Sequence, residues 1–352
     1  MGDLTPRLKV AIATPLSDEL CELLVRLEPR LDLLCEQDLL PPMRWIGDHR
    51  GDPAFRRTQE QQARFDALLD AADAFYGIPD TTPAVLSQAV KRNPRLRWVH
   101  TMAAGGGSQV KAAGLSPADL ERVVFTTSAG PHADSLAEFA VFGVYAGAKD
   151  LPRLHEQQQQ RVWSNRWAMR QVSDMTVLVV GLGSIGRAVV NRFAGQAARV
   201  IAVNRSRKVV PGVSQVYLPE ELEAAMAEAD VIINTAPGTD RSNRMIGKAA
   251  FAAAKRGVIV VNVGRGSVID GEALVLALQD GRVSFAALDV FDAEPLPHDS
   301  PLWAMDNVVI SPHTAALTDS EDRLIAELFA ANASALLDGT PLANIVNTVE
   351  FY

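Results

Sequence analysis

The stretch Val177-Leu-Val-Val-Gly-Leu-Gly-Ser-Ile-Gly186 decides the fold of this 352-residue chain. Its first four residues are apolar, as in a strand that helices cover on both faces. The strand runs directly into the pattern G-x-G-x-x-G, and a helical pattern follows over residues 187–193. Gly181 permits a tight turn, Gly183 lets a ligand approach the backbone, and Gly186 lets the helix pack closely on the strand. In this setting the motif predicts a dinucleotide site, whose phosphates accept hydrogen bonds from the N–H groups that begin the helix.

Similar strands recur along the rest of the chain. From residue 175 onward the apolar, mostly β-branched runs are 177–180, 200–203, 231–233, 258–263, 285–290 and 308–310. Earlier runs at 8–13, 31–35, 74–77 and 98–102 alternate with helical patterns in the same way. Alternation of strand and helix is typical of a parallel sheet. The sequence therefore predicts an α/β protein with two doubly wound parallel-sheet domains. An apolar helix over residues 133–149 is expected to be buried on several sides, against another domain or subunit.

Length and composition exclude several classes of protein. A chain of 352 residues suggests two domains. The difference between 34 basic and 42 acidic side chains gives a net charge of −8, which disfavours nucleic acids and anionic membrane surfaces as partners. Cys21 and Cys35 are too few for a zinc site or a disulfide framework, and no other spacing suggests a metal. The first residues lack the apolar segment of a signal peptide and the helix at 133–149 is too short to span a bilayer, so we expect a cytoplasmic protein with no membrane partner.

The residues after the strand at 200–203 bear on which dinucleotide binds. An NAD site usually has an acidic residue there, which accepts hydrogen bonds from the ribose. This chain instead has Asn204-Arg205-Ser206-Arg207-Lys208. Cations without a carboxylate suit the 2′-phosphate of NADP, through charge-assisted hydrogen bonds. The same cations would also suit a solvated loop. We therefore favour NADP(H), with NAD(H) as the alternative.

Three side chains of complementary chemistry follow the last three strands. These are Arg265, Glu294 and His313. Ligands of open α/β sheets bind where the strands end. The set suits reduction of a 2-oxo acid: Arg265 anchors the substrate, His313 donates a proton, and Glu294 favours the charged imidazole and fixes the ring. Each residue alone has an ordinary structural explanation, so the hypothesis depends on their occurring together.

Several motifs resemble those of the D-2-hydroxyacid dehydrogenases, most closely the glyoxylate and hydroxypyruvate reductase branch. In chain order they are Ser135-Leu-Ala-Glu138, Gly181-Leu-Gly-Ser-Ile-Gly186, Asn262-Val-Gly-Arg-Gly-Ser-Val-Ile-Asp270, Leu288-Asp-Val-Phe-Asp-Ala-Glu-Pro-Leu296 and Ser311-Pro-His-Thr-Ala-Ala316. The resemblance is strong over residues 130–317 and loose before them. It implies that Arg265, Glu294 and His313 are the catalytic residues.

The resemblance also implies a role for each domain. A Rossmann-type cofactor domain, residues 129–314, would be inserted in a flavodoxin-like substrate domain, residues 1–128 and 315–352. The apolar helix would belong to the cofactor domain and form part of a homodimer contact, while Asp289 would hold the nicotinamide side of the site. The implied cofactor-binding residues are Gly181, Gly183, Ser184, Ile185, Gly186, Asn204, Arg205, Ser206, Arg207, Thr235, Ala236, Pro237, Val263, Gly264, Asp289, His313 and Ala315.

A glycine-rich stretch, Ala104-Gly105-Gly106-Gly107, departs from the family pattern. In the family the loop that grips the substrate carboxylate usually reads Ala-Gly-Val-Asp. Backbone N–H groups of a glycine loop can still bind a carboxylate, although a plain flexible turn would have the same composition. The implied substrate-binding residues are Ala104, Gly105, Gly106, Arg265 and His313.

The other histidines are expected to be mainly structural. His100 would be packed in a strand, His132 would cap the long helix, and His155 and His298 would lie at the surface. His49 and Trp45 lie in a loop over residues 41–52 that is a candidate for closing the pocket. If His313 is not the proton donor, His100 is the next candidate.

Three functions remain open at this point. The leading hypothesis is an NADPH-dependent reductase of small 2-oxo acids. An NAD-linked phosphoglycerate- or formate-type dehydrogenase is the alternative within the enzymes. A transcriptional corepressor of the same fold, which uses the nucleotide as a signal, would retain the same motifs but turn over slowly.

Overall fold

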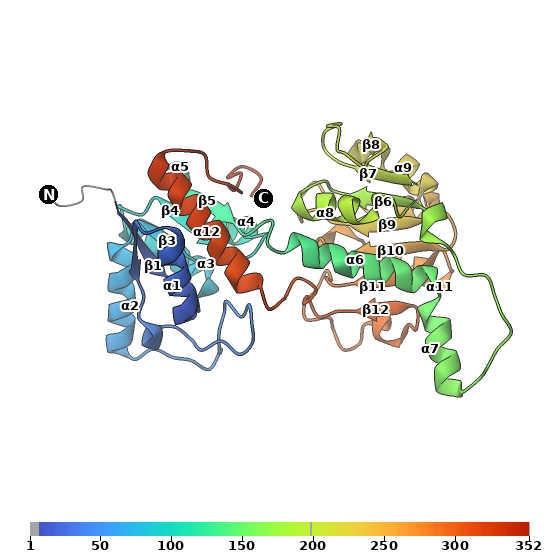
Figure 1. Ribbon diagram of the computed structural model, residues 1–352, viewed down its shortest axis with the longest axis horizontal. Helices are drawn as coiled ribbons and strands as arrows, with labels where there is room; N and C mark the ends of the chain where they lie inside the picture. Colours follow the sequence, from blue (N-terminus) through green and yellow to red (C-terminus); the bar gives the residue numbers. More distant parts are fainter. Residues whose placement is uncertain (1–6, 198, 352) are drawn as a thin grey trace. The chain divides into compact units, whose positions relative to one another are not determined.

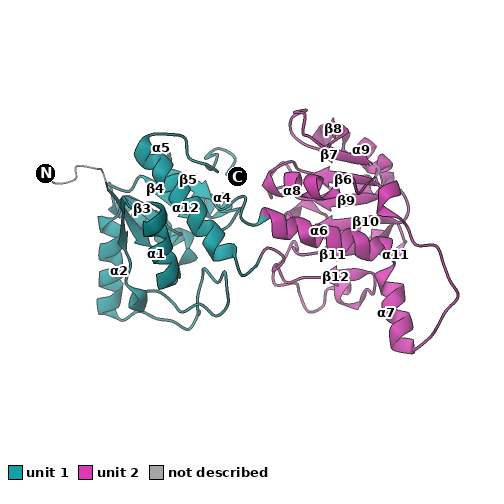
Figure 2. Cartoon of the chain, viewed as in Figure 1, with its two compact units in different colours: residues 1–132, 317–352 teal, residues 133–316 magenta. Residues whose placement is uncertain are grey.

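The computed structural model describes residues 7–197 and 199–351. The chain forms two compact units, drawn in teal and magenta in Figure 2. Unit 1 comprises residues 1–132 and 317–352, and unit 2 comprises residues 133–316. Unit 2 is therefore an insertion in the sequence of unit 1.

A five-stranded parallel sheet forms the centre of unit 1 (Figure 1). Its strands are β1 (Leu8–Ile12), β2 (Leu31–Leu34), β3 (Ala74–Tyr76), β4 (Trp98–Thr101) and β5 (Val124–Thr127), in the order β2-β1-β3-β4-β5. Its helices are α1 (Asp18–Leu27), α2 (Gln59–Ala71), α3 (Pro83–Arg92), α4 (Gly107–Ala112), α5 (Pro117–Arg122) and α12 (Glu321–Asp338). This strand order is that of a flavodoxin-like sheet. Fully buried Trp98 stacks on Phe329 of α12 with 4.4 Å between ring centroids, so the returning segment completes the core of unit 1.

Unit 2 is built on a seven-stranded parallel sheet of order β12-β11-β10-β9-β6-β7-β8. Its strands are β6 (Thr176–Val180), β7 (Arg199–Val203), β8 (Gln215–Tyr217), β9 (Val231–Asn234), β10 (Val258–Asn262), β11 (Val283–Leu288) and β12 (Val308–Ile310). Its helices are α6 (Ala133–Ala148), α7 (Leu151–Gln160), α8 (Ser184–Phe193), α9 (Leu222–Glu228), α10 (Lys248–Ala253) and α11 (Gly271–Gln279). The strand order reverses between β6 and β9, and ligands of doubly wound sheets bind outside the strand ends at such a switch point.

The predicted fold class, α/β with two parallel sheets, is confirmed. Two strands, β5 and β8, were not predicted from the sequence. Strand β5 reads Val-Phe-Thr-Thr, half of it polar, and β8 is a three-residue edge strand that reads Gln-Val-Tyr. Neither has the continuous apolar run by which the other strands were recognised.

Helix α6 is apolar largely because it packs on the sheet of its own unit. A Cβ added at Gly143 would lie 2.7 Å from the Cβ of Ala287, and one at Gly147 would lie 2.9 Å from Cγ1 of Ile259. The helix therefore packs with almost no spacing on β10 and β11. Nine of its sixteen residues are buried, while Phe142 and Tyr145 are exposed, so the prediction that a further domain or subunit covers the rest of the helix stays a prediction. Within residues 7–197 and 199–351, no helix combines the length and apolarity that crossing a membrane requires.

Candidate active site

The glycine motif forms a cradle at the carboxyl end of β6. Gly181 has φ of +96°, and its N–H donates to the carbonyl of Val203 at 2.8 Å. A Cβ at Gly186 would lie 2.0 Å from the carbonyl oxygen of Gly181, so α8 approaches β6 this closely only because residue 186 is glycine. Thr235 Oγ1 donates to the same oxygen at 2.7 Å, which ties the turn after β9 to the cradle. A Cβ at Gly183 would meet no atom within 4 Å, so the cradle is open where α8 begins and fits a dinucleotide pyrophosphate.

Two buried asparagines organise the neighbouring strand ends, and sequence reasoning assigned a role to neither. Asn234 ends β9 and Asn262 ends β10, and they are paired in register. Asn234 Nδ2 donates to Asn262 Oδ1 at 2.8 Å. The side-chain oxygens accept the N–H groups of Ala236 at 3.1 Å and Gly264 at 3.2 Å. They therefore shape both turns that border the cradle. Asparagine at the end of two adjacent buried strands was the signal in the sequence, since a buried amide requires polar partners.

The cationic loop after β7 is partly occupied by contacts within the protein. Asn204, which stands where an NAD site carries its carboxylate, accepts a backbone N–H of the glycine motif at 3.4 Å and donates to the carbonyl of Ser206 at 3.1 Å. Arg207 donates to both carboxylate oxygens of Glu221 at 2.7 Å. The Arg205 side chain is exposed. Arg207 thus already has a bidentate anionic partner within the protein.

His313 and Glu294 meet at the ends of β12 and β11. His313 Nδ1 lies 2.7 Å from Glu294 Oε2. The other carboxylate oxygen of Glu294 accepts the N–H of Phe291 at 3.0 Å, which holds the carboxylate in place. Because this contact uses Nδ1, the nitrogen that remains for a substrate is Nε2. The two side chains are 48% and 35% exposed, so a small molecule can reach them.

Buried Asp289 shapes the turn that carries His313. Its side chain is at the end of β11, where the residue is 1% exposed. Asp289 Oδ1 accepts hydrogen bonds from Ser311 Oγ at 2.6 Å, the Thr314 N–H at 2.9 Å and the Ala315 N–H at 3.0 Å. The carbonyl of Asp289 also accepts the N–H of His313 at 3.0 Å. These bonds hold His313 at a φ of +55°, a conformation that costs energy for a residue other than glycine.

Arg265 reaches the same sheet edge from the end of β10. The next residue, Gly266, lets this loop contact the loop after β11, because a Cβ there would lie 1.9 Å from a backbone carbonyl carbon of that loop. Burial lowers the pKa of Arg265, and the carboxylates of Glu294 and Asp289 oppose this effect. A guanidinium, a carboxylate and the imidazole of His313 are thus brought to three adjacent strand ends.

The predicted substrate loop, Ala104 to Gly106, belongs to unit 1 and follows β4. It forms a turn, and Gly107 is already the first residue of α4. A Cβ at Gly106 would lie 1.8 Å from Oγ1 of Thr101. The Thr101 side chain therefore fills the space that the valine of the family pattern would need. The departure from the family sequence has this steric cause.

His100 is the packed histidine that the sequence suggested. Trp98 Nε1 donates to Thr126 Oγ1 at 2.8 Å, so the hydroxyl hydrogen of Thr126 is left for His100 Nδ1, also at 2.8 Å. His100 Nε2 then carries the ring hydrogen and donates to Ser128 Oγ at 3.0 Å. Burial lowers the pKa of His100 to about 3. With a neutral ring and both nitrogens engaged, His100 is no substitute for His313 as a proton donor.

The remaining singled-out residues lie at other places in the chain. His49 Nε2 lies 3.7 Å and His132 Nδ1 3.5 Å from Oε1 of buried Glu321, all within unit 1. His132 was predicted to cap the long helix, and its contact with the carboxylate of Glu321 was not predicted. Trp45 is 53% exposed in its loop. His155 and His298 are exposed.

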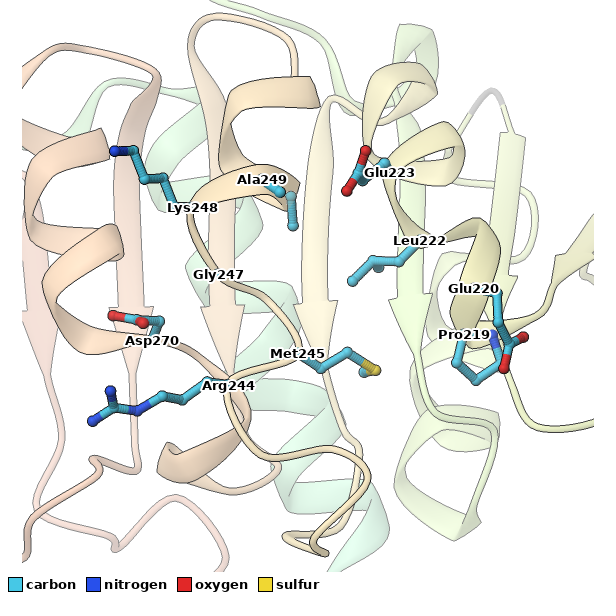
Figure 3. A pocket seen from close by; sticks show the side chains of 11 residues that line it. Pro219, Glu220, Leu222, Glu223, Arg244, Met245, Gly247, Lys248, Ala249 and Asp270 are labelled. Carbon is cyan, nitrogen blue, oxygen red and sulfur yellow. The ribbon is translucent and has the colours of Figure 1, made fainter.

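A surface hollow in unit 2 shares no residue with the predicted site. Figure 3 shows this hollow, of about 410 Å³, between the segment that precedes α9 and the start of α10. Side chains of both signs line it, among them Glu220, Glu223, Arg244, Lys248 and Asp270. The site is therefore assigned from the strand ends and not from this hollow. In the described part of the chain, no group of three or more His, Cys, Asp or Glu side chains is arranged to hold a metal ion.

Comparison with known proteins identifies the family. Residues 141–315 match the model described as D-isomer specific 2-hydroxyacid dehydrogenase, NAD binding domain. The glyoxylate reductase of Aeropyrum pernix is 31% identical over 303 residues, which are 82% of this chain and 87% of that protein. The chain belongs to the D-isomer specific 2-hydroxyacid dehydrogenase family. It is accordingly an oxidoreductase with a domain that binds a nicotinamide cofactor.

Two further relatives show the breadth of this dehydrogenase family. The D-3-phosphoglycerate dehydrogenase of Archaeoglobus fulgidus is 32% identical over 238 residues, and the chain covers 44% of its length. A D-isomer specific 2-hydroxyacid dehydrogenase from Xanthobacter autotrophicus Py2, in a crystal structure with NADPH and MES, is 26% identical with a TM-score of 0.78. That alignment covers 99% of this chain and 100% of the other.

Proposed function

We propose that this dehydrogenase reduces a small 2-oxo acid, of the glyoxylate or hydroxypyruvate kind, to the D-2-hydroxy acid with NADPH. The observation that carries the proposal is the 2.7 Å contact between His313 Nδ1 and Glu294 Oε2, which leaves Nε2 for the substrate. Arg265 stands at the neighbouring strand end, and the glycine cradle lies on the same sheet edge. The likeness to a glyoxylate reductase supports this substrate class.

Each catalytic side chain has one task in this scheme. When bound, the reduced nicotinamide supplies the hydride. Arg265 holds the carboxylate and carbonyl oxygen of the 2-oxo acid with its planar fork of N–H donors. His313 gives its Nε2 proton to the carbonyl oxygen as that oxygen becomes negative, and Glu294 holds the ring and stabilises the imidazolium. In the oxidative direction, the neutral ring accepts the proton from the alcohol.

The cofactor would lie along the edge formed by β6, β7, β9 and β10. The residues proposed to bind it are those expected from the sequence, from Gly181 to Ala315. We expect NADPH to be preferred, because Asn204 replaces the carboxylate that would repel a 2′-phosphate. Arg205 and Arg207 both follow Asn204 in the loop after β7, and both are proposed as partners of the phosphate. The NADPH complex of the Xanthobacter relative supports this preference.

The two units would have different roles in this reaction. Unit 2 would bind the cofactor, and unit 1 would bind the substrate carboxylate through backbone N–H groups of the loop from Ala104 to Gly106. Asp289 would act mainly through His313, whose turn it holds. The cytoplasmic location stays a prediction.

A homodimer contact is proposed on the exposed side of α6 and on the segment after it. Phe142 and Tyr145 of α6 are exposed, as are Leu151 and Leu154 of α7, and Trp163 is 100% exposed. Figure 1 shows α7 standing away from the sheet of unit 2. These side chains lie close together in the sequence, and a contiguous apolar patch would be typical of an interface between proteins. Light scattering on the parent protein and on Trp163→Ser would test this: a dimer in the parent and weaker association in the variant are expected.

The deciding experiment is a turnover assay on the purified protein with each nicotinamide. Glyoxylate and hydroxypyruvate with NADPH should give the highest kcat/KM, above larger 2-oxo acids. The similarity to a phosphoglycerate dehydrogenase makes phosphohydroxypyruvate with NADH the natural comparison. Preference for that pair would replace the proposal, and binding of NADPH without turnover of any 2-oxo acid would indicate a nucleotide sensor.

Arg205→Ala tests the cofactor assignment. A charge-assisted hydrogen bond contributes roughly 1.5–3 kcal/mol, so KM for NADPH should rise about ten- to a hundredfold while KM for NADH hardly changes. Arg207→Ala should also raise KM for NADPH, since the second arginine of the loop is proposed to share the phosphate. An equal loss with both cofactors would contradict the 2′-phosphate assignment.

A further inference from the structure

The two cysteines of the chain meet in unit 1. Cys21 lies on α1, and Cys35 directly follows β2. Their sulfur atoms are 4.0 Å apart, the distance of an S–H···S hydrogen bond, and both residues are free thiols. Both side chains are half-buried, so reagents of modest size can reach them. A chain of 352 residues with two cysteines thus places them side by side.

Hydrogen bonds at both ends of β2 hold Cys35 close to Cys21. Near the cysteines, Gln37 Nε2 donates to Asp18 Oδ1 at 2.8 Å and to the carbonyl of Leu16 at 2.9 Å. These bonds tie the residues after Cys35 to the start of α1. At the other end, the N–H of Leu31 donates to the carbonyl of Glu28 at 3.1 Å. The helix and the strand are therefore held against each other on either side of the sulfur pair.

The hydrogen bond makes the two thiols chemically unequal. Donation from the Cys21 thiol lowers the pKa of Cys35, although burial and the charge of Asp18 act in the opposite direction. The same bond, together with burial, raises the pKa of Cys21. Thiolate is the nucleophilic form of cysteine. Cys35 is accordingly the sulfur that attacks first.

We propose that Cys21 and Cys35 are a redox-active dithiol, which forms a reversible intramolecular disulfide by exchange with a small organic disulfide. In the first step, the Cys35 thiolate attacks one sulfur of the reagent, a mixed disulfide forms, and one small thiolate leaves. The Cys21 sulfur then attacks Cys35, and the second small thiolate leaves. The two protein thiols are oxidised, the small disulfide is reduced to two thiols, and the two thiol protons pass to them.

The geometry requires only a modest movement for this bond. A disulfide has an S–S length of about 2.05 Å, so the sulfurs must approach by roughly 2 Å. The bond would close a loop between residues 21 and 35 and join α1 to the end of β2. Cross-links of this kind restrict the unfolded chain. The oxidised protein should therefore unfold at a higher temperature than the reduced protein. This site is independent of the proposed reaction, because it involves no residue of the catalytic set.

Oxidised glutathione is the probe for the test, with intact-mass spectrometry after alkylation of the remaining thiols. The parent protein should lose two hydrogens, accept no alkyl group and retain no glutathione, and dithiothreitol should restore both thiols. Cys21→Ser and Cys35→Ser should instead each keep one glutathione as a stable mixed disulfide, with unchanged keto-acid turnover. Stable glutathione adducts on the parent, or two thiols that remain alkylatable after prolonged exposure, would overturn the proposal.

The inequality of the thiols has its own test. Cys21→Ala removes the hydrogen-bond donor, whereas Cys21→Ser keeps a donor in the same place. Alkylation of Cys35 by iodoacetamide near neutral pH should be slower in the alanine variant than in the serine variant. Equal rates in the two variants would contradict the assignment of Cys35 as the attacking sulfur.

Discussion

Each parallel sheet of this protein carries a histidine near its carboxyl edge, and the two rings have opposite surroundings. His100, in β4 of unit 1, is fully buried between two hydroxyl groups, and burial lowers its pKa to about 3. His313, after β12 of unit 2, is 48% exposed and faces the carboxylate of Glu294. One ring has both nitrogens engaged by neutral partners. The other has an anion at Nδ1 and leaves Nε2 for a substrate. Both histidines lie at a sheet edge, so the groups around each ring determine whether it can donate a proton.

The two edges differ beyond their histidines. The edge of unit 2 carries Arg265 and Glu294 and is organised by buried polar side chains such as Asp289. The edge of unit 1 carries hydroxyl groups and the glycine turn packed on Thr101. We therefore expect unit 2 to supply the reacting side chains and unit 1 to supply backbone N–H groups.

His313→Ala has the largest expected effect. A positioned general acid contributes typically 10²–10⁴-fold to rate. Turnover of the keto acid should fall by this order at every pH, while NADPH affinity, measured by fluorescence titration, stays near the parent value. The matched variant His100→Asn should keep kcat per folded molecule within a few-fold of the parent.

Two outcomes would break the comparison between the histidines. Near-normal turnover in His313→Ala would place the acid elsewhere. A loss in His100→Asn as large as the loss in His313→Ala, at equal folded fraction, would mean that the buried ring takes part in the chemistry.

Arg265→Lys tests whether the charged edge binds the substrate. Lysine keeps the charge but loses the planar pair of donors. We expect KM for the 2-oxo acid to rise about ten- to a hundredfold, the equivalent of one charge-assisted hydrogen bond. Affinity for NADPH should be preserved. If the variant fails to bind NADPH, Arg265 belongs to the scaffold or to the cofactor site.

Much of this arrangement was readable from the sequence, because parallel strands end in the same direction. The apolar runs located ten of the strands, and the residues after them included Arg265, Glu294 and His313. What the sequence could not supply was contact between distant residues. The pairing of Arg207 with Glu221, the three hydrogen bonds that Asp289 Oδ1 accepts from one turn and the meeting of Cys21 with Cys35 all depend on how the chain returns on itself. Strands β5 and β8 were missed because their own residues are too polar or too few.

Glu294→Gln tests the role of the negative charge beside His313. The amide keeps the size of the side chain and removes its negative charge, so the imidazolium loses its ion-pair partner. We expect keto-acid reduction to slow by roughly tenfold, less than the 10²–10⁴-fold that loss of the acid itself costs. KM for NADPH should stay unchanged. A rate of reduction equal to that of the parent would contradict the coupling of the two residues.

The smallest expected effect concerns the stability that depends on His100. Its pKa is about 3 in the folded protein, against an ordinary value of 6.5. Between these two values the unfolded chain binds a proton that the folded chain does not. The free energy of unfolding therefore falls as pH falls through this window, by up to about 1.4 kcal/mol per pH unit for one such group.

His100→Asn removes this proton-binding site and keeps a polar side chain between the two hydroxyls. At neutral pH the variant should be less stable than the parent, because its hydrogen bonds fit less well, but its free energy of unfolding should depend less on pH. Urea denaturation across the window from 6.5 to about 3 measures both curves. His298→Asn, a change at an exposed histidine, controls for the loss of an imidazole as such. If the parent and His100→Asn curves stay parallel, the buried ring binds a proton in the folded state, and the contrast between His100 and His313 loses its electrostatic basis.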